Sequence, residues 1–429
     1  MSLTRDLVRL IRIKPVSQHD LDAAALFTLD AVANALAGRR TEPGKKLLAL
    51  MVKLNGSGDA GRMALLQGGL THILEMDDLH RASVVHPGCV VVPAAFALAS
   101  QTGVGGVGFL SAVLQGFEAT CRVGMAVGQE HYKIWHSTAT CGPFGSAMAA
   151  ACLLDLDEDA CVDALGNAGT QAAGLWQFLD TGAMSKHLHA GRGAEAGVIA
   201  AELAALGFSG PPQILEGACG LFAGACPDAD PQALLKHPEQ RWQLHETSIK
   251  PWPCCRHTHP VIDAALELSA KIDAALIDSI VVETYQAALD VCDRPGVESV
   301  YEAKFSLQHC VAAALTNGRI DFAAFEKPAR ENLSECRGRV TLRACEPYLS
   351  AYPRDWGAAV RVTLKDGAEV SALRSHCKGD PEDSLSEGEM RDKARMLLAL
   401  GGVAEPEQLI DGILAMSGGG VPPVLPLLI

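Results

Sequence analysis

The sequence predicts a mainly helical protein in which a smaller α+β domain follows a large all-α domain. Apolar residues recur at helical spacing through most of the first half of the chain, and no strand-like alternation appears before about residue 245. From about residue 246, runs rich in β-branched residues alternate with helical patterns. Helical patterns return near the C-terminus and could pack on the large domain. We therefore expect an all-α domain over residues 1–245, completed by 386–429, and an α+β domain over 246–385.

The expected helices of the large domain follow one another closely along the chain. The first begins at the N-cap residue Asp20 and ends at Gly38. The helix interiors are rich in Ala and Gly, which lets neighbouring helices approach closely. The other helices are expected near 44–55, 60–78, 91–101, 107–127, 144–154, 157–179 and 192–207.

The α+β domain is predicted from three strand signals. The runs Ile280–Tyr285 and Val340–Arg343 are β-branched, and Ala359–Arg374 alternates about Asp366-Gly367, a dipeptide typical of a tight hairpin turn. The last residues, GGGVPPVLPLLI, are expected to form an extended apolar tail in a surface groove. Helices are expected near 258–271, 305–316, 386–400 and 406–415.

Composition limits the classes of partner. The chain has 429 residues, of which 48% are hydrophobic and 20% charged, as in a folded protein with a sizeable core. The net charge of −14 argues against nucleic acid or an anionic membrane surface as the main partner. It is compatible with a small anionic substrate, because a local basic pocket can outweigh a distant acidic surface.

Cysteine usage and the N-terminal residues indicate the compartment. The 14 cysteines are scattered and include no CxxC pair, which favours reduced thiols and argues against structural zinc. The first residues contain no secretory signal, so we expect a cytoplasmic protein. The uncharged span from Pro87 to Glu118 is divided by Pro93 and Gly105-Gly106, so we expect two buried helices there and no membrane partner.

The most concentrated group of ionisable residues is HILEMDDLHRASVVHPG, residues 72–88, which lies between apolar flanks. It holds three histidines, three carboxylates and one arginine. Such crowding near apolar walls is typical of functional sites. The alternative interpretation is a helix end at which Asp and His cap backbone groups.

Three further clusters carry cations and hydrogen-bond donors. In the first of them, His136 precedes small and hydroxyl residues that open a buried helix, whose amides can receive an anion. The other two are GAMSKHLHAGR, residues 182–192, and KPWPCCRHTH, residues 250–259. The four clusters together favour a substrate with two or three carboxylates, next to which an α-proton is removed.

The same residues also have other interpretations. His257 and His259, together with Asp77 and Asp78, could bind a divalent metal. Cys254-Cys255 could be redox-active, although neighbouring cysteines form a disulfide only with strain. His257 and His259 could also do no more than cap a helix that begins near Thr258.

Six motifs, in this order, make the sequence resemble the MmgE/PrpD family. The family includes 2-methylcitrate dehydratase, cis-aconitate decarboxylase and iminodisuccinate epimerase. The resemblance implies an all-α domain made of N- and C-terminal segments, a smaller inserted α+β domain, a homodimer, and a metal-free site between the domains. The motifs are HILEMDDLHRASVVHPG, WHSTATCGPFGSAMAAACLL, SKHLHAGRGAEAGVIAAELAALGFSGP, KPWPCCRHTHPVIDAA, YEAKFSLQHCVAAAL and KGDPEDSLSEGEMRDK.

The resemblance carries over residue by residue, with departures. His86, His136 and Lys186 match positions associated with binding and catalysis, and Asp77-Asp78 match the family's paired aspartates. Departures from the family's residues at Glu75, Leu79 and Cys255 argue against cis-aconitate decarboxylation, although His257 lies two residues after Cys255, and the family's usual Pro is also replaced at Ser137. Glu75 replaces Asp, Leu79 replaces Thr, Ser137 replaces Pro, and Cys255 replaces a histidine.

The sequence therefore predicts a cofactor-independent lyase that acts on a small di- or tricarboxylate by α-proton abstraction and β-elimination, similar to 2-methylcitrate dehydratase. The alternatives are a dicarboxylate epimerase, a cis-aconitate decarboxylase and a non-catalytic carboxylate-binding protein. No metal or other cofactor is expected. The predicted catalytic residues are His86, His136, Lys186, Glu75, Asp77 and Asp78, and the predicted substrate-binding residues are His80, Arg192, Lys250, Cys255, Arg256 and His257.

Overall fold

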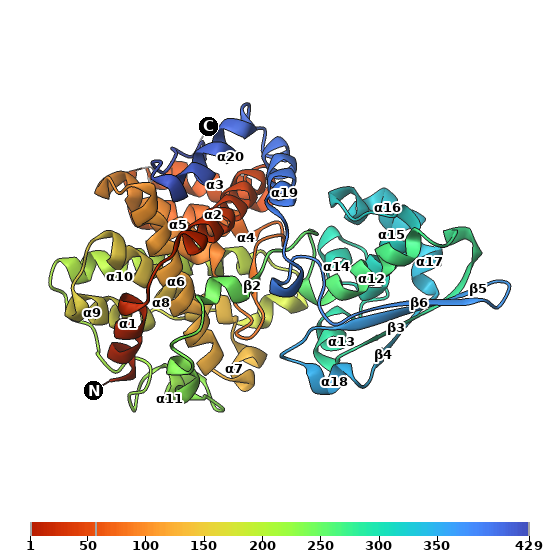
Figure 1. Cartoon of the computed structure of the whole chain (residues 1–429), viewed down its shortest axis with the longest axis horizontal. Helices are drawn as coiled ribbons and strands as arrows, with labels where there is room; N and C mark the ends of the chain where they lie inside the picture. The colour runs from red at the N-terminus through yellow and green to blue at the C-terminus, as the bar shows by residue number, and fades with distance from the viewer. Residues whose placement is uncertain (1, 56–57, 428–429) are drawn as a thin grey trace. The chain divides into compact units, whose positions relative to one another are not determined.

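The computed structural model describes residues 2–55 and 58–427 and is mainly helical. The chain divides into two compact units, shown in Figure 1. The larger unit comprises Met1–Ile249 and Ser386–Ile429, so that the C-terminal segment belongs with the N-terminal half of the chain. The smaller unit is Lys250–Leu385.

The larger unit is built around long helices that are buried on most of their faces. Helices α4, α5, α6, α8 and α10 pack on one another, and small residues let them approach closely. At Gly145 of α8, a Cβ atom would lie 1.7 Å from Oγ1 of Thr120 on α6, so only glycine fits. The helices of this unit are α1 (Leu3–Ile13), α2 (Gln18–Gly38), α3 (Glu42–Leu54), α4 (Ala60–His72), α5 (Gly88–Thr102), α6 (Gly106–Ala126), α7 (Gln129–Ile134), α8 (Ser137–Leu153), α9 (Glu158–Gly169), α10 (Ser185–Ala205), α11 (Leu221–Ala225), α19 (Glu387–Leu400) and α20 (Pro406–Leu414).

Several predicted helix boundaries were wrong for identifiable reasons. Helix α2 begins after Ser17 rather than Asp20, because Ser17 and Asp20 form a capping box in which Asp20 is the third helical residue. Helix α4 ends at His72 rather than near residue 78, since Glu75 has a left-handed φ of 59°. Helix α8 begins before Pro143, which the prediction had placed outside the helix. Helix α9 ends at Gly169, and α10 begins at Ser185 rather than 192.

The expectation of no strand before residue 245 was also wrong, because one strand of two residues lies there. Strand β1 (Leu79–His80) pairs antiparallel with β2 (Thr247–Ser248). Two residues are too few to produce a readable alternation of side chains. The pairing ties the chain that follows α4 to the last residues of the N-terminal segment.

Helix α2 is the one helix among the described residues that is long and apolar enough to cross a membrane. Its most apolar window is 83% buried inside the structure. Such burial is typical of a core helix.

The C-terminal segment packs on α2 through α19 and α20. From Gly420 to Pro426 the chain forms neither helix nor strand. The carbonyl of Gly420 accepts a hydrogen bond from the amide of Gly106, and Arg39 donates to the carbonyl of Pro426. The tail is not enclosed in a groove along its whole length, because Val424 is 96% exposed. The last two residues of the predicted tail, 428–429, lie outside the described part of the chain.

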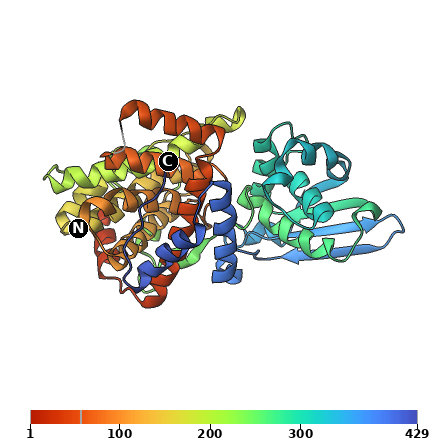
Figure 2. The same ribbon diagram turned by 90° about the horizontal axis from the view of Figure 1, so that it is seen from above.

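The smaller unit contains a four-stranded sheet in the order β4-β3-β5-β6. Strands β3 and β4 are parallel, and the other pairs are antiparallel. Helices α12 and α15 pack against the sheet, as Figure 2 shows from above. The Asp366-Gly367 hairpin is confirmed, with Gly367 at a φ of 85°. The elements are α12 (His259–Ser269), β3 (Ile277–Thr284), α13 (Gln286–Cys292), α14 (Val300–Lys304), α15 (Leu307–Asn317), α16 (Lys327–Asn332), α17 (Ser334–Gly338), β4 (Val340–Ala344), α18 (Tyr348–Ala351), β5 (Ala358–Leu364) and β6 (Glu369–Arg374).

Candidate functional site

Four imidazole rings meet inside the larger unit and form a histidine cluster, His72, His86, His136 and His189. The ring of His72 lies 4.6 Å from that of His86 and 5.7 Å from that of His136, measured between centroids. Nδ1 of His136 lies 3.3 Å from Nδ1 of His189. The sequence brings these rings together because His72 ends α4, His136 precedes α8 and His189 lies near the start of α10.

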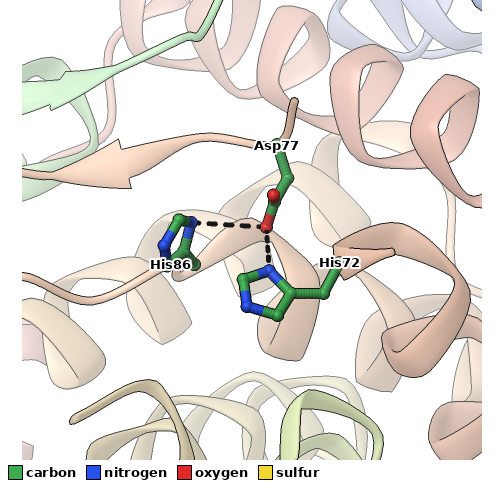
Figure 3. A group of neighbouring side chains, drawn as sticks. All are labelled: His72, Asp77 and His86. Atoms are coloured by element: carbon green, nitrogen blue, oxygen red, sulfur yellow. Dashed lines mark hydrogen bonds and ion pairs between the residues drawn. The ribbon is translucent and has the colours of Figure 1, made fainter. Parts of the chain in front are cut away.

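The carboxylate of Asp77 lies between two rings of the histidine cluster (Figure 3). Its Oδ2 atom is 2.6 Å from Nδ1 of His72 and 3.4 Å from Nδ1 of His86. Nδ1 of His86 also lies 2.5 Å from the backbone carbonyl oxygen of Asp78. Because these partners are oxygen acceptors, each Nδ1 carries a proton and donates it. Nε2 is therefore the nitrogen of both rings that can exchange protons with a substrate.

A buried ion pair lies beside the histidine cluster. Nζ of Lys186 is 2.5 Å from Oε1 of Glu75, and both side chains are almost fully buried. Glu75 adopts its left-handed φ of 59° in the turn between α4 and β1. A non-glycine residue in this conformation is strained, and such strain is found at functional sites where the surroundings hold it in place.

Helix N-termini supply further donors near these side chains. His136 is the N-cap residue of α8, and Met184 is the N-cap residue of α10; neither makes a side-chain capping hydrogen bond. The N-terminus of α5 is different, because both carboxylate oxygens of Asp78 accept from the amide of Gly88 at 3.0–3.1 Å. Asp78 therefore holds the start of a helix, although the sequence had grouped it with the catalytic residues.

Burial keeps two rings of the histidine cluster neutral. The pKa of His136 lies well below its ordinary value of 6.5, chiefly because of burial and then because of the positive charges that His72, Lys186, His189 and His86 can carry. Burial, with smaller contributions from His72 and Lys186, lowers the pKa of His189 to about 4. At neutral pH both rings are uncharged and can accept a proton.

An aromatic segment covers one side of the histidine cluster. It is the 3-10 helix Trp176–Asp180, in the connection between α9 and α10. The ring of Trp176 lies 4.7 Å from that of His136, and the ring of Phe178 lies 5.5 Å from that of His189. These rings provide the apolar surroundings that keep the imidazoles away from water.

Among the described residues, two groups of side chains have ligand atoms close enough to hold a metal ion. His72, Asp77 and His86 form one group, and His376, Asp380 and Glu382 form the other. In the first group, the 2.6 Å separation of Nδ1 and Oδ2 is that of a hydrogen bond. Bonds of about 2.1 Å to one zinc ion would place neighbouring ligands about 3 Å apart or more. In the second group, Asp380 is already paired with Arg256 at 2.5 Å. Neither group contains His257 or His259, which the sequence had suggested as metal ligands.

Two predicted substrate-binding residues of the larger unit have other partners. His80 contacts the Ser83 hydroxyl at 2.7 Å and Oε1 of Gln243 at 3.0 Å, and burial lowers its pKa to about 4. Arg192 pairs with Glu195 one turn along α10, and its side chain is 54% exposed.

The other predicted binding residues belong to the core of the smaller unit. Arg256 pairs with Asp380 and lies over the Trp356 ring, while His257 stacks on Trp356 at 4.4 Å. Nδ1 of His257 lies 2.7 Å from the Tyr285 hydroxyl, so this ring does not cap α12. Burial lowers the pKa of His257 to about 3. Lys250 and Cys255 are also buried, and Cys254 and Cys255 are free thiols.

Sequence reasoning did not select His72, His189 and Trp176. His189 could have been found, because it lies three residues after Lys186 on a helix and therefore on the same face. His72 lay in the ionisable stretch, but its contact with Asp77 depends on the turn at Glu75. Trp176 carried no signal, because its connection was predicted to be part of a helix.

Fold and site together define a mainly helical protein with a buried group of imidazoles, carboxylates and one lysine in its larger unit. The MmgE/PrpD N-terminal domain model matches residues 5–234, and the MmgE/PrpD C-terminal domain model matches residues 252–415. The chain belongs to the MmgE/PrpD family.

The chain is similar to several proteins named cis-aconitate decarboxylase, or named as similar to it. Cis-aconitate decarboxylase of Homo sapiens is 27% identical over 347 residues, which cover 77% of this chain and 71% of that protein. Cis-aconitate decarboxylase of Aspergillus terreus is 28% identical over 276 residues, 58% of this chain and 56% of that protein. The cis-aconitate decarboxylase-like protein oryM of Aspergillus oryzae is 31% identical over 221 residues, 48% of this chain and 46% of that protein.

Proposed function

We propose that the protein is a cofactor-independent lyase that removes a proton α to a carboxylate of a small di- or tricarboxylate and then eliminates a β-hydroxyl group. The observation that carries the proposal is the group formed by buried Lys186, neutral His136 and the Asp77-oriented His86. It combines a cation for a carboxylate with two separate nitrogens for proton transfer.

Lys186 is proposed to hold the carboxylate next to the reacting carbon. Glu75 is its partner at 2.5 Å, so an incoming carboxylate would compete with Glu75 for the ammonium group. The same ammonium charge would stabilise the negative charge that develops on the substrate carboxylate when the α-proton leaves.

His136 is proposed to accept the α-proton, because its depressed pKa leaves the ring neutral at physiological pH. A bound carboxylate would offset the Lys186 charge and so make His136 a stronger base. As the C–H bond breaks, its electron pair forms the C=C bond and the C–O bond breaks. His86 would donate a proton to the departing hydroxyl, which leaves as water, and Asp77 at 3.4 Å would stabilise the imidazolium form of His86. Proton exchange with solvent then restores both rings.

Decarboxylation of cis-aconitate is the second candidate, favoured by the names of the curated relatives. In that reaction a C–CO₂ bond breaks, and an imidazolium protonates the resulting carbanion. The sequence departures at Glu75, Leu79 and Cys255 argue against decarboxylation and do not distinguish elimination from epimerisation. An epimerase would share the first proton transfer and then return the proton to the opposite face.

A panel of 2-methylcitrate, citrate, cis-aconitate and iminodisuccinate tests these proposals. Elimination gives a rise in ultraviolet absorbance, decarboxylation releases CO₂, and epimerisation changes only the optical rotation. The proposal predicts turnover by the first route and its loss in His136→Ala and Lys186→Ala. Binding of panel members without turnover by any route would instead favour a carboxylate-binding protein. Light scattering during size-exclusion chromatography would test the homodimer that the family resemblance implies.

A further inference from the structure

A buried lysine from the C-terminal segment reaches the turn that carries the site's two carboxylates. Lys393 of α19 is 7% exposed. Its Nζ atom lies 2.5 Å from Oδ1 of Asp30 on α2 and donates a 2.7 Å hydrogen bond to the backbone carbonyl of Met76. This carbonyl lies in the turn between α4 and β1.

Met76 separates the two carboxylates of the proposed site. Glu75, on one side, pairs with Lys186, and Asp77, on the other, faces His72 and His86. A rotation of the Met76 peptide would therefore displace both carboxylates together. The amide of Asn34 also donates to the Met76 carbonyl, at a longer distance of 3.4 Å.

The local backbone conformation needs external support. Glu75 is held at a φ of 59°, which costs energy for a residue with a Cβ atom. A charged donor bound to the next carbonyl opposes relaxation of the turn, and a charge-assisted hydrogen bond is stronger than a neutral one. Asp30 compensates the lysine charge, which could otherwise not remain buried.

We propose that Lys393 is a positioning residue, which fixes the 75–77 turn and through it the orientation of Glu75 and Asp77. The proposal rests on the proposed function, because it assigns Lys393 a role in the geometry of that same site. Lys393 acts through the turn and has no role of its own in proton transfer. The C-terminal segment thus completes the site as well as the fold of the larger unit.

The test variant is the double replacement Lys393→Met with Asp30→Asn. It removes both charges, so that no unpaired buried charge remains. Since a displacement of about 1 Å in a catalytic group can cost about 10²-fold in rate, we expect kcat to fall by about 10- to 100-fold, with KM changed by less than about threefold. The control is Arg395→Met on the same helix, which removes surface ion pairs with Asp392 and Glu407 and should leave kcat unchanged.

A second readout does not depend on turnover. The proton in the short hydrogen bond between His72 and Asp77 should resonate far downfield in the proton NMR spectrum of the wild type. Its resonance should shift or disappear in the double variant and remain in Arg395→Met. If the double variant does not fold, Lys393→Arg keeps a positive charge beside Asp30 but replaces the compact ammonium donor to the Met76 carbonyl, and it should lower kcat by about threefold, since small displacements carry smaller rate costs.

The outcomes separate the two proposals. An active wild type together with a folded double variant of unchanged kcat and unchanged proton resonance would overturn the role of Lys393 alone. A wild type that turns over no member of the carboxylate panel would overturn the proposed function, while the resonance would still report on the turn. For an unfolded double variant, a folded Lys393→Arg with unchanged kcat and unchanged proton resonance would overturn the positioning role.

Discussion

Nδ1 of His72 and Oδ2 of Asp77 lie 2.6 Å apart in the interior of the larger unit, where both side chains are buried. The bond fixes the His72 ring and directs Nε2 away from the carboxylate (Figure 3). Among the described residues, Nε2 of His72 makes no hydrogen bond. A buried polar atom without a partner costs stability, so its retention is an indication of function.

Asp77→Asn should lower kcat by about 10²-fold, because the amide cannot stabilise an imidazolium and can present its NH₂ group to the Nδ1 donors. Steady-state kinetics on the substrate identified by the panel would measure this loss. Asp22→Asn, at an exposed position of α2, is the matched control. A folded Asp77→Asn protein with wild-type kcat would show that the carboxylate charge is not needed.

Lys186→Met should reduce kcat/KM by about 10²- to 10³-fold, since it removes the cation that holds and stabilises the reacting carboxylate. It also leaves Glu75 buried without its present cation, so stability should fall by about 3–5 kcal/mol. Both kinetics and urea unfolding should therefore be measured, with Lys186→Met/Glu75→Gln as the variant that restores charge balance. Lys133→Met, which removes an exposed pair with Glu130, should behave as wild type. Recovery of full activity in the charge-balanced variant would contradict a substrate-binding role for Lys186.

The depressed pKa values of His136 and His189 make stability depend on pH. In the unfolded chain these rings take up protons near their ordinary pKa of 6.5, whereas in the folded protein His189 does so at about 4 and His136 also well below 6.5. The free energy of unfolding should therefore be independent of these rings above pH 6.5 and fall as the pH decreases from 6.5 toward 4.

Urea unfolding at several pH values would measure this effect. Between its pKa in the folded protein and its pKa in the unfolded chain, each ring changes the free energy of unfolding by up to about 1.4 kcal/mol per pH unit. His189→Gln should lower the slope of the free energy of unfolding against pH. His237→Gln, at an exposed position, should leave this slope unchanged. Identical slopes for wild type and His189→Gln would argue against a buried neutral His189.

The parts of the fold with local signals could be predicted from the sequence. The Asp366-Gly367 hairpin was predictable because its turn residues are themselves the cause of the turn. The start of α2 was misplaced by three residues, since Ser17 and Asp20 are both good capping residues and only the capping box assigns their positions.

The site was predictable only as a set of residue types. Glu75, Asp77, His86, His136 and Lys186 were selected from charge clustering and family resemblance, and the structure brings their side chains to one region of the larger unit. Their pairings were not predictable, because they depend on the positive φ at Glu75 and on where α4, α8 and α10 end or begin. Asp78 and Arg192 look similar to these residues in the sequence. In the structure, however, Asp78 accepts a hydrogen bond from the first residue of α5, and Arg192 pairs with Glu195.

Proton exchange at the substrate's α-carbon tests the central proposal most directly. In D₂O, wild-type protein incubated with the panel carboxylate that it turns over should exchange the α-proton for deuterium or form the elimination product, as followed by NMR and mass spectrometry. His136→Gln should still bind the carboxylate but show neither reaction. Exchange at the wild-type rate in folded His136→Gln would contradict the assignment of the base, and a wild type that binds a panel carboxylate without exchange or turnover would contradict the lyase proposal itself.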